Sequence, residues 1–231
     1  MSIKLLTFDL DDTLWDVATV ITHAEDTLRR WLGENAPLLG PLPLAELHHY
    51  RDQLLANEPA LKHRISELRQ RLLHHALSQA GYSQAQAQAL AEHAFAVFLS
   101  ARQEVELFAD VHSTLAELSK RYSLAVITNG NADVRRIGLG HYFEFTLSAE
   151  ELGVGKPDPL PFTTALHRAG VQAAQAVHIG DHPRDDIAGA QHAGYQAIWV
   201  NRSSEPWSGQ SSPDGQISAL AQLPDVLATL G

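Results

Sequence analysis

Apolar and polar positions divide the chain into a short first strand, a long helical stretch, and a part in which strands alternate with helices. Residues 3–7 are an apolar run that ends in acidic residues, which is typical of a buried strand leading into a site. Residues 17 to about 102 are helical in pattern, because apolar residues recur at steps of three and four, for example over 61–76. Ser83 and Gln86 have the spacing of a capping box for the next helix. An all-helical block therefore follows the first strand directly.

From about residue 107 the pattern changes to alternating strands and helices. Asp110 precedes the apolar positions of a helix and is expected to cap it. Further strands are predicted over residues 124–128, 145–147, 176–180 and 196–200, the last strand of the chain. Helices are predicted over residues 161–169, 186–193 and 217–230, with a Ser-, Pro- and Gly-rich loop over 202–216. This alternation predicts an α/β fold with a parallel sheet.

Polar residues lie where three of the predicted strands end: Asp9 and Asp11, Thr128, and Asp181. In open parallel sheets, ligands bind at the carboxyl ends of the strands. Side chains alternate along a strand, so Asp9 and Asp11 are expected to point to the same side. Two neighbouring carboxylates suit a hard cation such as Mg²⁺. An acidic turn after an edge strand would explain the first pair alone, but not polar residues at three strand ends.

Composition and charge exclude several classes of protein. The chain has 17 Lys and Arg against 27 Asp and Glu, a net charge of -10, which argues against a nucleic-acid-binding surface. It has no long apolar run, so no membrane-spanning helix is expected. The absence of cysteine excludes a disulfide framework, a thiolate zinc site and a Cys nucleophile. With no signal-peptide pattern either, we expect a cytoplasmic protein.

Four short motifs follow one another along the chain: Asp9-x-Asp11-x-Thr13, Ile127-Thr128-Asn129-Gly130, Gly155-Lys156-Pro157 and Gly180-Asp181-x4-Asp186. Together they resemble the haloacid dehalogenase superfamily, in its aspartate-nucleophile phosphatase branch. The resemblance spans residues 8–190. It implies a Rossmann-like parallel-sheet core over residues 1–16 and 107–231, with an all-helical cap inserted over 17–106.

The resemblance also implies roles for the acidic pair and for a metal ion. Asp9 would be the nucleophile and form an aspartyl-phosphate. Asp11 would protonate the leaving alkoxide and then activate water as a base. Mg²⁺ would bind the Asp9 carboxylate, the backbone carbonyl of Asp11, and Asp181. Elementary electrostatics points the same way, because a carboxylate that attacks a phosphate dianion needs compensating positive charge.

The remaining motif residues would hold the phosphoryl group or support those that do. Thr128, the backbone N–H of Asn129, and Lys156 would bind the phosphoryl oxygens. Thr13 would orient Asp11 by a hydrogen bond or cap its turn. Asp186 would orient Lys156 or a metal-bound water, while Asp185 would cap the helix that begins at Asp186, although these two acids could exchange roles.

The resemblance bears on the substrate, which is expected to be a small phosphorylated metabolite. Dehalogenases of the superfamily lack the second aspartate of the first motif, so Asp11 favours phosphate-ester hydrolysis. A finer resemblance is to bacterial phosphatases of riboflavin synthesis, which act on flavin mononucleotide and on the phosphorylated ribitylamino-pyrimidine precursor. Trp15, His63 and Arg64 are candidates to contact the leaving group, and a packing hinge is the alternative for Trp15.

Other interpretations stay open at this stage. A phosphomutase uses the same first step, and a sugar or nucleotide phosphatase of the same superfamily would carry the same motifs. A receiver-type signalling domain also places Asp, Thr and Lys around Mg²⁺, but such domains are about half this length and have no inserted helical block. The sequence carries no signal for an oligomeric state.

Overall fold

A computed structural model describes residues 2–230 of the chain. The chain forms two compact units, one made of Met1–Asp16 with Glu106–Gly231 and the other of Val17–Val105. None of the helices within residues 2–230 combines the length and apolar character needed to cross a bilayer.

The first unit is built on a six-stranded parallel sheet with the order β3-β2-β1-β4-β5-β6. The strands are β1 (Leu5–Phe8), β2 (Ser123–Thr128), β3 (Phe145–Ser148), β4 (Ala176–Gly180), β5 (Gln196–Val200) and β6 (Gly215–Ile217). β1 lies centrally and pairs with β2 on one side and β4 on the other. The strand order reverses there, because the chain goes from β1 outward to β3 and returns to the opposite side with β4. The predicted parallel α/β fold is confirmed, and this switch point lies where the motif residues leave the sheet.

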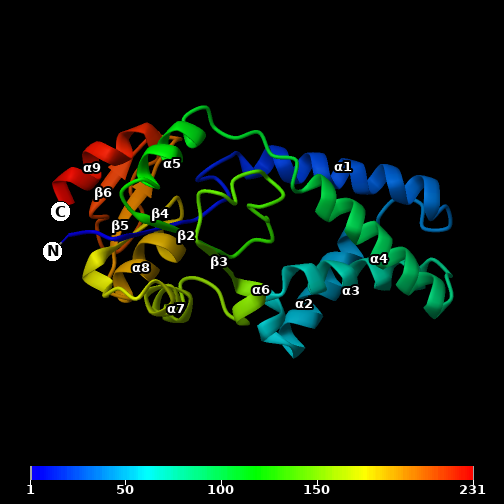
Figure 1. The fold of residues 1–231 in the computed structure, drawn as a ribbon. Helices are drawn as coiled ribbons and strands as arrows, with labels where there is room; N and C mark the ends of the chain where they lie inside the picture. Colours follow the sequence, from blue (N-terminus) through cyan, green and yellow to red (C-terminus); the bar gives the residue numbers. More distant parts are fainter. Residues whose placement is uncertain (1, 231) are drawn as a thin grey trace. The chain divides into compact units, whose positions relative to one another are not determined.

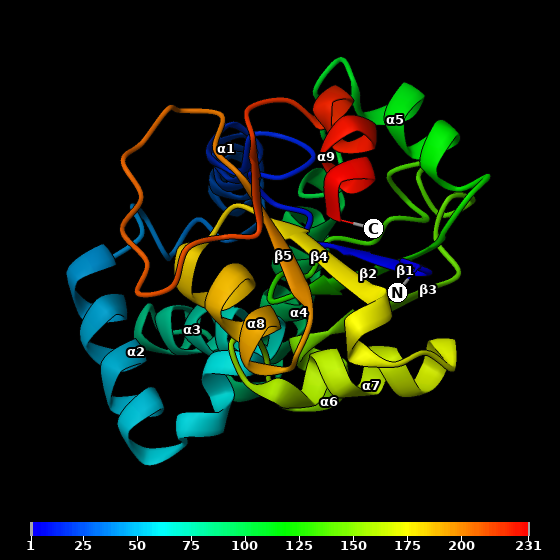
Figure 2. The same ribbon diagram turned by 90° about the vertical axis from the view of Figure 1, so that its left-hand side faces the viewer.

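Helices cover both faces of the sheet (Figures 1 and 2). α5 (Val111–Leu118) and α9 (Leu223–Leu230) lie on one face, and α7 (Pro159–Ala169) and α8 (Gly189–His192) lie on the other. The strands are buried on both faces, which explains their continuous apolar runs. On the α7 and α8 face the core includes Leu5, Ala125, Phe145, Phe162, Ala165, Ala176, Ala190, Tyr195 and Trp199. Short elements complete this unit: α6 (Ala149–Leu152), η2 (Ala173–Gln175), η3 (Pro183–Ala188) and η4 (Leu220–Gln222).

The second unit is helical throughout. It contains α1 (Val17–Asn35), α2 (Leu44–Asn57), η1 (Pro59–His63), α3 (Ile65–Gln79) and α4 (Gln84–Ala101). α4 packs on both α1 and α3, and its buried alanines at 87, 91 and 94 allow close approach. The predicted capping box is present, since the Ser83 hydroxyl accepts from the Gln86 N–H and the Gln86 side chain accepts from the Ser83 N–H.

Several predicted elements and caps differ in the structure. The helix predicted over 61–76 begins only at Ile65, because Arg64 has non-helical backbone angles (φ -114°, ψ 63°) and separates α3 from a 3₁₀ turn. A sixth strand, β6, follows the predicted last strand and pairs with β5, although it is too short to carry a readable pattern. Asp110 precedes α5 without capping it through its side chain, which instead accepts a hydrogen bond from the Ala221 N–H.

Candidate functional site

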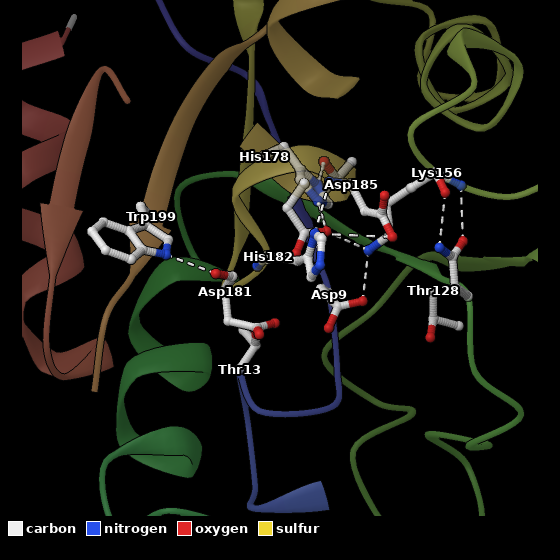
Figure 3. A network of polar contacts seen from close by, with 12 residues as sticks. Asp9, Thr13, Thr128, Lys156, His178, Asp181, His182, Asp185 and Trp199 are labelled. Carbon is white, nitrogen blue, oxygen red and sulfur yellow. Dashed lines mark hydrogen bonds and ion pairs between the residues drawn. The ribbon is translucent and has the colours of Figure 1, made fainter. Parts of the chain in front are cut away.

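The motif residues meet at the carboxyl edge of the sheet (Figure 3). Asp9 follows β1 directly, and its N–H donates to Ile179 O at 2.9 Å, which extends the pairing with β4 by one residue. Thr128 is the last residue of β2, and Asp181 follows β4. Asp9 and Thr128 are buried. The topology therefore brings together residues from three distant parts of the chain.

Lys156 is the cation of the site. Its Nζ donates to Asp9 Oδ1 at 2.6 Å and to Asp186 Oδ1 at 2.6 Å, and its side chain is buried. Burial lowers the pKa of Lys156, but Asp186 and Asp9 outweigh this effect and hold the pKa above its usual range. Burial opposes ionisation of Asp186 too, yet Lys156 and His178 hold the pKa of that carboxyl well below its usual range. Lys156 is thus a permanent cation shared by two carboxyl groups.

The backbone of Lys156 is clamped by the side chain of Asn129. Asn129 Nδ2 donates to Lys156 O at 2.9 Å, and the Lys156 N–H donates to Asn129 Oδ1 at 2.8 Å. A Cβ on Gly155 would lie 2.3 Å from the same Oδ1, so glycine is needed for the approach. The sequence predicted only a backbone contribution from Asn129. Its amide joins the loop after β2 to the loop that carries Lys156.

Asp186, and not Asp185, is the acid that contacts Lys156. It is buried within a π-helical turn, η3, whose N-cap is His182. His182 Nδ1 accepts from the Asp185 N–H at 3.1 Å, so the prediction that Asp185 caps this helix was wrong. An imidazole can accept through an unprotonated nitrogen, and here it replaces the expected carboxylate. A Cβ on Gly180 would lie 2.3 Å from Asp186 Cγ, so glycine at the end of β4 makes room for the carboxyl group.

Three carboxyl groups offer a metal-ligand set. Oxygen atoms of Asp9, Asp181 and Asp186 lie within 4.8 Å of one another. Burial, together with Asp186 and Asp181, raises the pKa of Asp9 well above its usual range, despite the opposing effect of Lys156. Burial and then Asp186 raise the pKa of Asp181 to about 7. One lysine does not compensate three carboxylates. Both oxygens of Asp186 accept hydrogen bonds within the protein, so Asp9 and Asp181 are the carboxyl groups left to bind a hard divalent cation.

The geometry of Asp11 differs from the prediction. Strand β1 ends at Phe8, so Asp9 and Asp11 do not share one face of a strand. Asp11 lies in the turn that follows, where its Oδ1 accepts from Trp15 Nε1–H at 2.9 Å. Trp15 is fully buried, which favours the packing alternative for this residue. Thr13 Oγ1 donates to Asp181 Oδ1 at 3.4 Å instead of to Asp11, because the turn directs its hydroxyl towards β4.

The other predicted residues have these surroundings. Thr128 Oγ1 accepts from the Gly130 N–H at 2.9 Å, which shapes the turn after β2. His63 and Arg64 belong to the helical unit, where Arg64 pairs with Glu67 at 2.7 Å. Their contact with a leaving group stays a prediction.

Sequence reasoning overlooked two residues of this site. His178 lies in β4 and donates from Nε2 to Asp186 Oδ1 over 3.0 Å. A histidine inside the buried apolar run of residues 176–180 was the available signal. Trp199 Nε1–H donates to Asp181 O at 2.7 Å and fixes the backbone after β4. No local sequence pattern predicts this contact, because Trp199 in β5 is distant in sequence from Asp181.

Comparison with known proteins gives consistent matches along the chain. The profile of the haloacid dehalogenase-like hydrolases matches residues 3–194. The 5-amino-6-(5-phospho-D-ribitylamino)uracil phosphatase YigB of Escherichia coli K12 is 33% identical over 97% of this chain and 96% of the relative. A phosphoserine phosphatase of Thermus thermophilus is 33% identical over 95% of this chain and 97% of the relative. A crystal structure described as a 2-haloacid dehalogenase from Pseudomonas syringae pv. Tomato DC3000 is 57% identical, with a TM-score of 0.97 over 99% of this chain and 100% of that chain.

Proposed function

Because this chain belongs to the haloacid dehalogenase-like hydrolases, we propose that it is a Mg²⁺-dependent phosphatase that forms an aspartyl-phosphate at Asp9. The observation that carries the proposal is the position of Lys156, 2.6 Å from Asp9 and buried beside Asp181 and Asp186. A nucleophilic carboxylate, a fixed cation and a hard-metal ligand set thus occupy one edge of the sheet. Both phosphatase relatives span nearly the whole chain, which supports the same reaction.

The charges of the site suit a phosphoryl group. Asp9 attacks phosphorus as a carboxylate, and its raised pKa means that positive charge nearby favours the reactive form. Mg²⁺, held by Asp9, Asp181 and the backbone carbonyl of Asp11, would supply that charge and polarise the phosphoryl oxygens. Lys156 Nζ donates to Asp9, and a bound phosphoryl group would compete for the same donor. Thr128 and the N–H of Asn129 would bind the remaining phosphoryl oxygens.

Asp11 is proposed as the general acid and base. Protonation of the leaving alkoxide, followed by removal of a proton from water, requires one carboxyl group that changes its protonation state. The indole of Trp15 holds this carboxyl group by a hydrogen bond, so we assign Trp15 to packing and orientation.

We propose a small phosphorylated metabolite as the substrate, and within this class a phosphate ester of riboflavin synthesis. The similarity to the Escherichia coli phosphatase over nearly the full length of both chains supports that class. His63 and Arg64 of the helical unit are the candidates to contact the leaving group. Alanine at these two positions should change the ranking of large substrates, such as flavin mononucleotide, more than the turnover of acetyl phosphate.

Dehalogenation of 2-haloacids is the second candidate, because the Pseudomonas syringae structure with that description is 57% identical to this chain. Dehalogenation would leave Asp11 without its proposed role. A halide leaves without a proton, so Asp11 would have no role as an acid.

Parallel assays separate the two candidates. The purified protein is given a phosphate monoester and, separately, 2-chloropropionate, each with Mg²⁺ or with excess chelator. The proposal expects phosphate release that requires the metal and disappears in the Asp9→Asn variant, with no chloride release. Chloride release that persists in chelator, without phosphate release, would contradict it. A phosphomutase would instead return the phosphoryl group to its substrate, and free phosphate would not accumulate.

A further inference from the structure

A chain of buried polar side chains runs from the middle of the sheet to the nucleophile. Thr7 Oγ1 lies 2.8 Å from His178 Nδ1, and His178 Nε2 lies 3.0 Å from Asp186 Oδ1. Asp186 Oδ1 also accepts from Lys156 Nζ, which in turn donates to Asp9. Figure 3 shows His178 on β4 directed towards this group. The proposed chemistry uses Lys156 and Asp9, but it gives no role to His178.

The hydrogen bonds of His178 fit one neutral tautomer. The ring is fully buried, and burial lowers its pKa, which favours the neutral form. Because Asp186 can only accept, Nε2 carries the proton and Nδ1 is unprotonated. The Thr7 hydroxyl then donates to Nδ1, and its other acceptor, Val177 O, is more distant at 3.5 Å. Thr7 and His178 face each other across paired strands, so the sheet itself fixes this arrangement.

Two further contacts fix the ring and the carboxyl group. Phe162 of α7 packs edge-on against the His178 ring, with the centroids 5.2 Å apart and the planes at 89°. Asp186 Oδ2 accepts from the His182 N–H at 2.9 Å. The carboxyl group is therefore held by donors at both oxygens, and His178 is the donor that comes from the sheet. A buried imidazole without such bonds would cost free energy, so an apolar residue would serve packing alone better.

We propose that His178 is a positioning residue, which holds Asp186 in the orientation that places Lys156 beside the nucleophile. The inference rests on the proposed phosphatase function. Lys156 is shared between Asp186 and Asp9, so its location depends on how firmly Asp186 is held. Loss of the His178 donor lets the Asp186 carboxyl group turn about its remaining bonds, and Lys156 then loses its fixed position between Asp186 and Asp9. The phosphoryl group loses a correctly placed donor.

The test compares two substitutions of similar size. His178→Gln keeps an N–H donor close to the position of Nε2, whereas His178→Met keeps the length and removes the donor. Supporting groups of this kind typically change affinity or activity by about 10- to 100-fold. We expect His178→Met to lose that much in kcat/KM and to weaken competitive inhibition by inorganic phosphate in parallel. His178→Gln should recover about half of the loss on a logarithmic scale.

Tyr195→Phe is the matched control, because Tyr195 is a buried ring that also packs edge-on against Phe162. Its hydroxyl donates to Phe162 O, away from Lys156, so its removal should leave the inhibition constant of phosphate unchanged. A His178→Met variant that is less stable but inhibited by phosphate as strongly as the wild type would overturn the proposal. So would equal losses in the Met and Gln variants while the fold is intact.

A second measurement does not depend on activity. Nitrogen-15 NMR of the wild-type histidines should contain a neutral ring protonated at Nε2, whose signals vanish in His178→Gln and shift in Thr7→Val. A ring protonated at Nδ1 would overturn the inference, because Asp186 would then receive no donor from it. If the wild type shows this tautomer but releases no phosphate from any ester, the proposed function fails while the hydrogen-bond chain stands.

Discussion

Replacement of Asp186 by asparagine tests the electrostatics of the site most simply. The side chain keeps its shape but loses its charge. Lys156 then has Asp9 alone as a partner, and the new amide NH₂ must face a donor, either the His182 N–H or the pair formed by Lys156 and His178. Asp186→Asn should therefore affect both stability and activity.

The structure sets the size of the stability loss. Breaking a buried ion pair typically costs about 3–5 kcal/mol, and a hydrogen bond to a charged group contributes about 1.5–3 kcal/mol. Lys156 keeps Asp9, so we expect the lower end, about 3 kcal/mol at pH 7. Turnover should fall on the order of a hundredfold, because Lys156 is no longer held.

The stability contributed by the Asp186 charge depends on pH. The pKa of Asp186 in the folded protein is lower than the usual value of 3.8, so its charge stabilises the fold at pH values above the unfolded pKa. That contribution is lost as the pH falls below about 4 towards the folded pKa. The part of the difference between wild type and Asp186→Asn that comes from the Asp186 charge should shrink below pH 4. Between pH 7 and pH 5 the difference also follows Asp9 and Asp181, because Asp186 raises the pKa of each.

Urea unfolding followed by tryptophan fluorescence, with chelator present, measures this difference. Asp185→Asn is the matched control, since the Asp185 carboxyl group lies 4.0 Å from His182 Nδ1 and is partly exposed. We expect its stability to change by less than about 0.5 kcal/mol. Equal effects of the two substitutions, or a difference that persists unchanged to pH 3, would refute the reasoning.

Three further predictions concern packing and metal binding. Gly180→Ala places a Cβ 2.3 Å from Asp186 Cγ and should lower the free energy of unfolding by about 1–3 kcal/mol. Its activity should fall as much as that of Asp186→Asn, and wild-type kinetics would contradict this. Tyr195→Phe removes the 2.8 Å bond to Phe162 O and should cost about 1 kcal/mol in thermal unfolding without changing turnover. Burial and Asp186 raise the pKa of Asp181 to about 7, so protons compete with Mg²⁺ for this carboxyl group. Calorimetry should show that Mg²⁺ binds more weakly as the pH falls from 7 to 6. A constant Mg²⁺ affinity over this range would argue against Asp181 as a ligand.

Much of the catalytic sheet could be predicted from the sequence, because a buried parallel strand is a continuous apolar run. Residues 124–128 and 196–200 are such runs and lie in β2 and β5. The sequence also predicted which strand ends carry polar residues. β6 was not predicted, because three residues give no periodic signal and its pairing with β5 depends on tertiary contacts.

Side-chain geometry was less predictable, because it depends on the backbone after each strand ends. Thr13 was expected beside Asp11 but donates to Asp181, since alternation stops where β1 ends. Asp185 was expected as a helix cap, a role for which aspartate is favoured, but His182 takes it in a π-helical turn. The local pattern did not reveal that turn.

The central claim is that Asp9 carries a covalent phosphoryl group, and acid-quench labelling tests it most directly. The Asp11→Asn variant, which keeps the nucleophile but lacks the proposed base, is mixed with Mg²⁺ and radiolabelled acetyl phosphate, quenched in acid and digested. We predict label on the peptide that contains Asp9, released by hydroxylamine as expected for an acyl phosphate. Asp9→Asn should give no label. Turnover of the same ester by the wild type, with no label on Asp9 in the Asp11→Asn variant, would contradict the account.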